Sequence, residues 1–292
     1  MLYTIKNNLL TVTISDHGAE LKSIKYEDRE YLHDANPAFW GRTAPFLWPN
    51  IGTIKNGYAT IDGVKYPMKK HGFLRDCDFL VTVQEENKIT FVLKSNEETL
   101  KLYPFNFINT ITYELTNTTV NVSLNFQNKS LKAMPFNLGL HPAFKVPLTK
   151  DEKFEDYYFE FDKEGTYEMP VVNLNDGTID FEKRNRSFIN LKELPLNYDD
   201  YLNDALIFEN INSHHISLKS HKSNHGVNFE FNEFSMLGLW TPIKLSAPFI
   251  CIEPWIGCAD RPDTDGTFTN KKDLIWVKPN ENKTIKYSFN IF

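Results

Sequence analysis

The chain has 292 residues, of which 41% are hydrophobic and 24% are charged, and these fractions are typical of a folded globular protein rather than a disordered or fibrous one. It carries 32 Lys and Arg against 38 Asp and Glu, which gives a net charge of −6. A modest acidic excess without a block of like charge argues against nucleic acid or an anionic membrane as the main partner.

The chain has three cysteines, Cys77, Cys251 and Cys258. Because their number is odd and the chain is long, a disulfide framework is not expected, and a reducing compartment suits the protein better. No stretch approaches about 18 consecutive apolar residues, and the N-terminal region lacks the basic start and apolar run of a secretion signal. We therefore expect a cytoplasmic protein with no membrane partner.

Apolar and polar residues alternate in many places, which is the pattern of a half-buried β-strand. In chain order the pattern predicts strands at 10–14, 79–83, 107–115, 120–127, 216–220, 227–231 and 285–291. The segment Thr116-Asn-Thr-Thr119 between two of these strands is short enough for a hairpin turn. Two continuously apolar runs, 236–240 and 249–252, predict central strands that are covered on both faces.

Helical periodicity is nearly absent, and single helical turns are expected only near 97–102 and 198–203. The chain contains 23 Phe, 13 Tyr and 5 Trp, and aromatic residues favour strands. Many closely spaced strands with turns between them indicate a sandwich or a barrel. Since no repeat or linker divides the sequence, we predict one all-β domain over residues 1–292.

Three long segments, 37–78, 134–147 and 253–268, have the composition of loops but are rich in large and polar side chains. Long ordered loops on a β scaffold frequently carry function. Taken singly, their His, Arg and Glu residues are more often packing or ion-pairing groups than catalytic ones. Together they favour sugar chemistry, which needs a base, an acid, polar anchors for hydroxyls and an aromatic wall for the apolar face of the ring.

The most specific motifs are Arg42-Thr-Ala-Pro-Phe-Leu-Trp-Pro49 with Gly52 after it, His71-Gly-Phe-Leu-Arg75, Leu140-His-Pro-Ala-Phe144 and Ile252-Glu-Pro-Trp255. In this order they resemble the galactose mutarotase-like (aldose 1-epimerase) superfamily, and within it the LacX-type branch, near the hexose-6-phosphate mutarotases. The resemblance extends over essentially the whole chain. It implies a large antiparallel β-sandwich, the supersandwich, with a few short helical turns and a site in a cleft on one sheet.

The resemblance also implies roles for individual residues. It makes Glu253 the general base and His141 the general acid of an isomerase that interconverts the α and β anomers of a hexose. The positions that match the substrate-binding groups of the family are Arg42, His71, Arg75 and Asp204. One position departs from the pattern, because the phosphosugar enzymes often have Gln before the His-Gly-Phe unit, where this chain has Lys70.

The chemistry supports these roles independently. Anomers interconvert when a pyranose ring opens to the free aldehyde, and this requires the C1 hydroxyl to lose a proton while the ring oxygen gains one. A carboxylate suits the first transfer, and a histidine, with an ordinary pKa of about 6.5, suits the second. The reaction needs no metal, nucleotide or redox cofactor, so we expect none.

Three alternatives stay open at this point. A hexose-6-phosphate 1-epimerase could hold its phosphate with Arg42 and Arg75, assisted by Lys69 and Lys70, because Arg suits bidentate recognition of an anion. A carbohydrate-binding protein without catalysis is possible because a fold does not fix a function. A glycosidase would need two carboxylates about 5–9.5 Å apart, whereas only one Glu lies in a strong motif.

Overall fold

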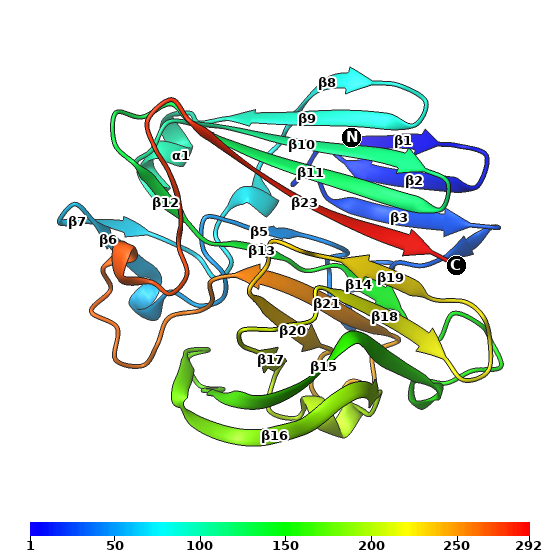
Figure 1. Cartoon of the computed structure of the whole chain (residues 1–292). Coiled ribbons are helices and arrows are strands. Elements are labelled where there is room, and N and C mark those ends of the chain that lie inside the picture. Colours follow the sequence, from blue (N-terminus) through cyan, green and yellow to red (C-terminus); the bar gives the residue numbers. More distant parts are fainter.

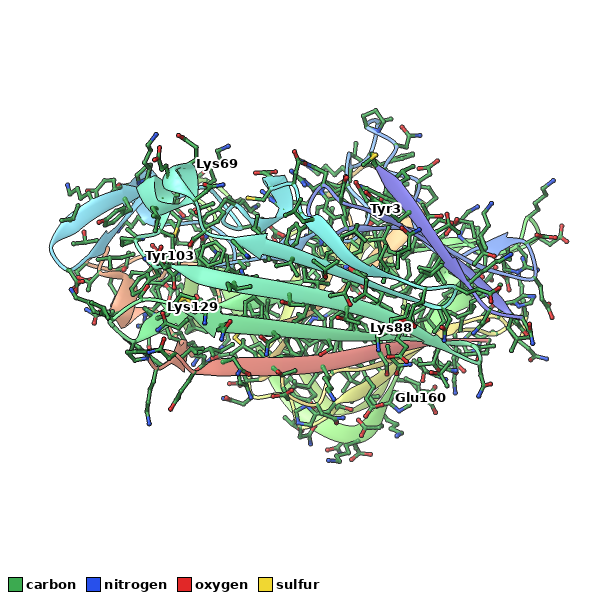
Figure 2. The ribbon with its side chains drawn as sticks, turned by 90° about the horizontal axis from the view of Figure 1, so that it is seen from above. Tyr3, Lys69, Lys88, Tyr103, Lys129 and Glu160 are labelled. Carbon is green, nitrogen blue, oxygen red and sulfur yellow. The ribbon has the colours of Figure 1, made fainter.

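The computed structural model describes all residues, 1–292, and places them almost entirely in antiparallel β-sheets (Figure 1). The largest sheet has nine strands. In their spatial order these are β16 (Ile179–Pro195), β15 (Tyr157–Val172), β18 (His215–Ser220), β19 (Val227–Glu230), β23 (Asn282–Ile291), β11 (Thr119–Asn128), β10 (Phe107–Thr116), β9 (Lys88–Lys94) and β8 (Leu80–Gln84). Figure 2 looks from above onto this sheet, where β10, β11 and β23 run side by side.

A second sheet, of six strands, lies under the first in Figure 1. Its strands in spatial order are β17 (Leu206–Phe208), β20 (Met236–Trp240), β21 (Phe249–Ile256), β13 (Leu138–Leu140) and β5 (Phe46–Leu47), with β14 (Ala143–Lys145) also paired to β21. The edge strand β16 and its neighbour β15 in the large sheet curl past the second sheet, so the strands of the second sheet lie between them and β10 in Figure 1. The second sheet is therefore covered on both faces.

The remaining elements are small. A four-stranded sheet contains β1 (Leu2–Lys6), β2 (Leu10–Ser15), β3 (Leu21–Tyr26) and β4 (Arg29–Glu30). It packs on the core where the ring of Tyr3, in β1, meets the ring of Phe91, in β9. Two-stranded pairs are formed by β6 (Tyr58–Ile61) with β7 (Val64–Pro67) and by β12 (Met134–Phe136) with β22 (Ile275–Val277). The helices are α1 (Glu97–Leu102) and five 3₁₀ turns, η1 (Lys55–Gly57), η2 (Leu74–Asp76), η3 (Phe154–Asp156), η4 (Tyr198–Tyr201) and η5 (Phe268–Asn270). None of the helices is long and apolar enough to cross a membrane.

The all-β prediction is confirmed, and the alternation of residues explains the central strands. Strands β10 and β11 pair from Phe107 with Asn128 to Thr116 with Thr119, as a hairpin. Every second residue of each strand is buried, because successive side chains point to opposite faces. The helical turn expected at 97–102 is α1, whose Asn96 caps the helix by accepting from the Thr99 N–H.

A single large apolar core fills the space between the sheets. At one end the indole of Trp48 is wholly buried, and the rings of Phe107 and Phe73 approach it edge-on at 4.8 and 5.4 Å. Such edge-to-face contacts stabilise a core beyond the area that they bury. At the other end Phe144, beside the second sheet, contacts Phe289 of the large sheet at 5.3 Å. All three cysteines are free thiols.

All three segments expected as loops contain strands. The segment 37–78 contains β5, β6 and β7, the segment 134–147 contains β12, β13 and β14, and β21 runs on from the predicted 249–252 to Ile256. The sequence predicted a strand that ends just before Glu253, but Glu253 lies in the middle of β21. The misleading signal is Pro254, which lacks a backbone N–H and usually marks the edge or the end of a strand.

A tight turn at Gly72 joins the core to the candidate site. Gly72 has φ +70° and bridges Trp48, and the next N–H, of Phe73, donates to the Trp48 carbonyl at 3.0 Å. A Cβ at residue 72 would lie 2.0 Å from that carbonyl oxygen. Only glycine fits this approach, and the turn that it allows fixes the neighbouring His71.

Replacement of this glycine tests that constraint. We expect Gly72→Ala to lower the free energy of unfolding by about 1–3 kcal/mol more than Gly63→Ala, because residue 63 also has positive φ, +77°, but open space around it. The shared backbone strain cancels in the comparison. Urea denaturation of both variants measures the difference, and equal losses would contradict the steric explanation.

Candidate active site

A cavity of about 470 Å³ lies on the face of the six-stranded sheet that points away from the main core. Strand β21 separates the two environments, because Ile250 and Ile252 enter the core while Glu253 and Trp255 line the cavity. Five of the six site residues expected from the sequence line this cavity, namely His71, Arg75, His141, Asp204 and Glu253. Segments far apart in the chain thus meet at one site.

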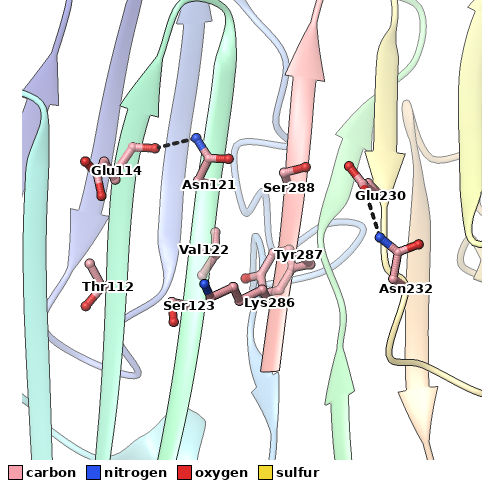
Figure 3. Close-up of a pocket in the computed structure, with 10 residues that line it drawn as sticks. All are labelled: Thr112, Glu114, Asn121, Val122, Ser123, Glu230, Asn232, Lys286, Tyr287 and Ser288. Atoms are coloured by element: carbon pink, nitrogen blue, oxygen red, sulfur yellow. Dashed lines mark hydrogen bonds between the residues drawn. The ribbon is translucent and has the colours of Figure 1, made fainter. Parts of the chain in front are cut away.

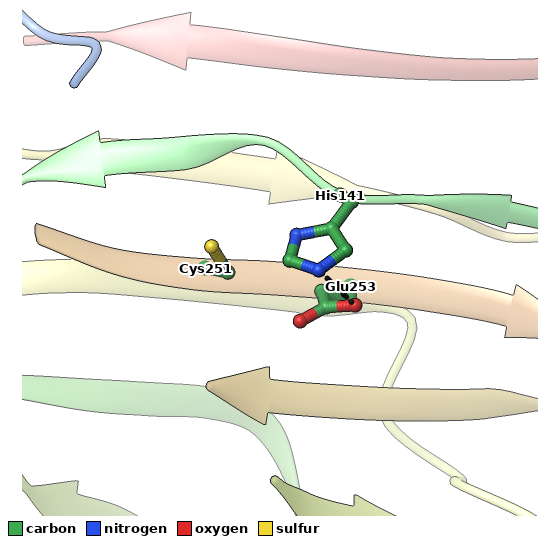
Figure 4. A group of neighbouring side chains, drawn as sticks. All are labelled: His141, Cys251 and Glu253. Atoms are coloured by element: carbon green, nitrogen blue, oxygen red, sulfur yellow. Dashed lines mark ion pairs between the residues drawn. The ribbon is translucent and has the colours of Figure 1, made fainter. Parts of the chain in front are cut away.

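The cavity contains a buried pair, His141 and Glu253 (Figure 4). Strands β13 and β14, on either side of His141, pair with β21 in one common register, which places His141 directly opposite Glu253. The Ile252 N–H donates to the Pro142 carbonyl at 3.2 Å and ties the two segments together between these strands. The His141 Nε2 lies 3.3 Å from the Glu253 Oε2, and both side chains are less than one-tenth exposed.

Burial opposes charge on both members of the pair. It raises the pKa of Glu253 well above its usual range, and the Asp204 carboxylate adds to this while Lys70 opposes it. Burial also lowers the pKa of His141 to about 3, helped by the positive charge of Arg75. Burial therefore favours the uncharged form of the pair, in which the carboxyl holds a proton and the imidazole is neutral.

His71 presents a defined tautomer to the cavity. Its backbone has φ +67°, in the turn described above. Its Nδ1 lies 3.0 Å from the Gly52 N–H and accepts from it. Burial and the neighbouring His141 hold the pKa of His71 well below its usual value, so the ring is neutral. A neutral ring whose Nδ1 accepts carries its proton on Nε2, which is then a hydrogen-bond donor for a ligand.

The two arginines of the sequence motifs are not equivalent in the structure. Arg75 lines the cavity, its Nη2 donates to the Lys70 carbonyl at 2.9 Å, and its buried Nε has no partner. Arg42 is not among the lining residues. It is paired with Asp76 at 2.5 Å and donates to the Arg75 carbonyl at 3.3 Å. Arg42 thus lies behind Arg75 and holds its loop, while Arg75 faces the cavity.

Asp204 lies on the segment between η4 and β17. Its backbone has φ +76°, and its Oδ1 accepts the Ala205 N–H at 2.8 Å. The other carboxylate oxygen has no protein hydrogen bond. Asp204 is half-buried and lines the cavity, so it can accept from the hydroxyl of a ligand while its charge disfavours a second carboxylate at Glu253.

Several lining residues were not foreseen as site residues. Trp40 and Trp240 form an aromatic wall beside His141, and Val172, Gly177 and Ile179 come from the β15–β16 ribbon and the turn that joins it. The ribbon gave no clear periodic signal because its pairing shifts register four times. Trp40 stands two residues before Arg42 in the sequence. The sequence alone, however, does not distinguish a tryptophan that lines a cavity from one that is buried in the core.

The buried pair has one further neighbour that could ligate a metal. Cys251 lies two residues before Glu253, on the same face of β21, and the ligand atoms of His141, Cys251 and Glu253 lie within 4.8 Å of one another (Figure 4). Zinc bonds of about 2.0–2.3 Å place neighbouring donors roughly 3.3–3.8 Å apart. The His141–Glu253 distance fits this spacing, whereas the full spread of the three donors is wider than a zinc site requires.

A second hollow, of about 330 Å³, lies on the outer face of the nine-stranded sheet (Figure 3). Polar side chains line it, and some bond to one another, as Asn232 does to Glu230. None of the site residues expected from the sequence lines it. The cavity on the six-stranded sheet is therefore the candidate active site.

The sequence matches the aldose 1-epimerase family model over residues 1–288. The chain therefore belongs to the aldose 1-epimerase family, as the motifs predicted. Among its curated relatives is the plasmid-encoded protein LacX of Lactococcus lactis subsp. lactis, which is 32% identical in an alignment that covers 100% of this chain and 99% of that one. The chromosomal LacX of the same organism gives the same values.

Solved structures share the fold over its whole length. The galactose mutarotase related enzyme from Lactobacillus acidophilus is 36% identical with a TM-score of 0.95, covering 100% of this chain and 97% of that one. A galactose mutarotase-like protein from Lactobacillus casei is 30% identical with a TM-score of 0.89, covering 100% of both. The expected galactose mutarotase-like sandwich is thereby confirmed.

The buried carboxyl predicts a pH-dependent cost in stability. The pKa of Glu253 is raised in the folded state, so its favourable contribution is present below the ordinary carboxyl pKa and is lost as pH rises toward the folded value. We expect Glu253→Gln to raise the melting temperature more at pH 8 than at pH 5, by about 2 °C per kcal/mol of relief. Calorimetry at both pH values measures this. The exposed Glu230→Gln is the control, and a pH-independent difference at residue 253 would contradict the argument.

Proposed function

We propose that this protein is an aldose 1-epimerase that interconverts the α and β anomers of a hexose. The observation that carries the proposal is the buried His141–Glu253 pair, 3.3 Å apart, in a cavity of about 470 Å³. A carboxyl and an imidazole that are buried side by side and can share a proton are suited to moving protons onto and off a bound sugar. Membership of the aldose 1-epimerase family supports this reading.

In the proposed reaction Glu253 takes the proton of the C1 hydroxyl while His141 gives a proton to the ring oxygen. The C1–O5 bond breaks, and C1 becomes the aldehyde carbon. Rotation about the C1–C2 bond presents the other face of the aldehyde, and the reverse transfers close the ring as the other anomer. One proton leaves the sugar and one enters it, so neither sugar nor enzyme changes its net charge.

The energetics of the pair suit ring opening. The transfers convert a carboxylate and an imidazolium into a carboxylic acid and a neutral imidazole. Burial favours this uncharged form, because it raises the pKa of Glu253 and lowers that of His141. The cyclic sugar restores the charged form when its hydroxyls donate to Glu253, since hydrogen bonds to a carboxylate favour ionisation.

The other lining residues supply binding groups for the sugar. The Nε2–H of His71 and the guanidinium of Arg75 can donate to hydroxyl oxygens, and the Asp204 carboxylate can accept from hydroxyls. Trp240, in the aromatic wall, offers an apolar surface to the apolar side of the ring. Arg42 acts in this proposal through the Arg75 loop, because its guanidinium is engaged by Asp76.

Substitution of the pair tests the proposal. We expect Glu253→Gln and His141→Asn each to reduce kcat by about 10² or more, since positioned acid–base catalysis contributes about that much. The double variant should lose far less than the product of the two, because the transfers are coupled. Polarimetry of freshly dissolved α-glucose and α-galactose measures the rates.

The matched control is another His and Glu that face each other across two strands. His215 and Glu230 pair directly between β18 and β19 and are exposed, away from the cavity. His215→Asn and Glu230→Gln should leave the rate unchanged. If the wild-type protein equilibrates every tested sugar no faster than buffer does, the proposal is wrong and a binding function without catalysis takes its place.

A second candidate is a hexose-6-phosphate 1-epimerase. Lys70 and Arg75 line the cavity together, and the buried Nε of Arg75 lacks a partner. The free hexose is favoured because Arg42, the other expected phosphate ligand, is bound to Asp76, and because a net charge of −6 does not attract an anion over long range.

Arg75→Ala separates the two substrates. If Arg75 holds a phosphate, the KM for glucose 6-phosphate should rise about 10- to 100-fold while that for glucose changes little, because a charge-assisted contact is lost. For a free-hexose enzyme we expect similar, smaller effects on both sugars. Initial rates with both substrates measure this. A wild-type preference of about a hundredfold or more for the phosphosugar would reverse the order of the candidates.

A further inference from the structure

The segment before the Arg42 motif places one indole ring directly on the catalytic pair. Trp40 stacks on the His141 imidazole with 4.6 Å between ring centroids and 25° between planes. The other two rings near His141 meet it edge-on, His71 at 5.8 Å and Trp240 at 5.5 Å. Trp40 is therefore the ring that covers a face of the imidazole, while Glu253 meets its Nε2.

The backbone holds Trp40 in this place. The His33 Nε2 donates to the Trp40 carbonyl at 3.0 Å, and the Trp40 N–H donates to the Asn36 carbonyl at 2.9 Å. The His33 N–H in turn donates to the Ala143 carbonyl at 2.9 Å, two residues beyond His141. The segment that carries the indole is thus bonded to the segment that carries the imidazole, and the stack does not depend on the two rings alone.

The proposed acid needs something that favours its proton. The surroundings of His141 mostly oppose a positive charge, through burial and through nearby cations. The charged and titratable groups around its ring are Arg75, Lys70, Arg42, His71, Cys251, Asp204 and Glu253. Among them only the carboxylate forms of Glu253 and Asp204 favour the imidazolium. The face of an indole carries negative charge density and attracts a cation, most strongly where water is excluded.

We propose that Trp40 is a positioning residue of the reaction, whose indole holds the His141 imidazole in line with Glu253 and stabilises the imidazolium that donates to the ring oxygen. This inference rests on the function proposed above. Under this proposal Trp40 affects the reaction through its contact with His141. A wall residue that only packed against the sugar would affect binding of the substrate instead.

Two substitutions separate the π face from the space that it fills. Trp40→Phe keeps an aromatic face over the imidazole, and Trp40→Leu keeps apolar cover without one. We expect Trp40→Leu to lower kcat about tenfold with KM within about twofold, and to move the alkaline limb of the kcat–pH profile about one unit to lower pH. The limb moves down because an imidazolium without the indole binds its proton less tightly. Trp40→Phe should retain kcat within about threefold, with a smaller displacement of the limb.

Trp276→Leu is the matched control, because Trp276 is half-exposed on β22 and does not line the cavity. It should leave kcat and the pH profile unchanged. Equal losses in the Leu and Phe variants, an unmoved alkaline limb or a change confined to KM would each overturn the inference. A KM effect alone would place Trp40 against the sugar instead.

Proton NMR tests the arrangement without relying on catalysis. The ring protons of His141, assigned by comparison with His141→Asn, should lie upfield in the wild-type protein because of the stacked indole. They should move downfield in Trp40→Leu and stay in place in Trp276→Leu. Signals that do not move would overturn the inference whatever the activity. Signals that move in a protein without anomer exchange would support the stacking but overturn the proposed function and, with it, the role of Trp40 in the reaction.

Discussion

The register between β21 and its neighbours β13 and β14 is the constraint on which the site depends. Both short strands pair with β21 in one register, and the residue between them, His141, is left opposite Glu253. A slip of one residue would reverse the faces of β21, sending Glu253 into the core and Ile252 into the cavity. The same backbone hydrogen bonds that complete the six-stranded sheet therefore also set the 3.3 Å separation of the pair.

This arrangement puts ionisable groups where a sheet would ordinarily bury apolar ones. Glu253 is 2% exposed and His141 is 7% exposed, and the His141 Nδ1 has no hydrogen-bond partner. Such groups cost stability unless they are paired. The cost is tolerable here because the pair shares one proton and can be uncharged. Poise between charged and uncharged forms is the property that a proton-transfer site requires.

The sequence predicts the fold better than it predicts which side chains contact one another or line the cavity. Alternation located the β10–β11 hairpin because one face of each strand is buried, but Pro254 hid the continuation of β21 past Glu253. Motifs placed five of the six expected residues at the cavity. They could not show that Asp76 engages Arg42, because that contact depends on how the loop at residues 74–76 folds back. The apolar wall from the β15–β16 ribbon was missed because its pairing is irregular.

The β15–β16 ribbon supplies a part of the cavity wall that does not belong to the sheet holding the buried pair. The buried His141–Glu253 pair belongs to the six-stranded sheet, whose other face packs on the core. Val172, Gly177 and Ile179, in contrast, come from the end of a ribbon at the edge of the nine-stranded sheet, where the strand pairing is irregular. A change in the length of this hairpin would alter the shape of the cavity without moving the strands that hold the buried pair. The architecture therefore allows the fit of a ligand to be adjusted in one part of the cavity while the geometry of the pair is kept in another.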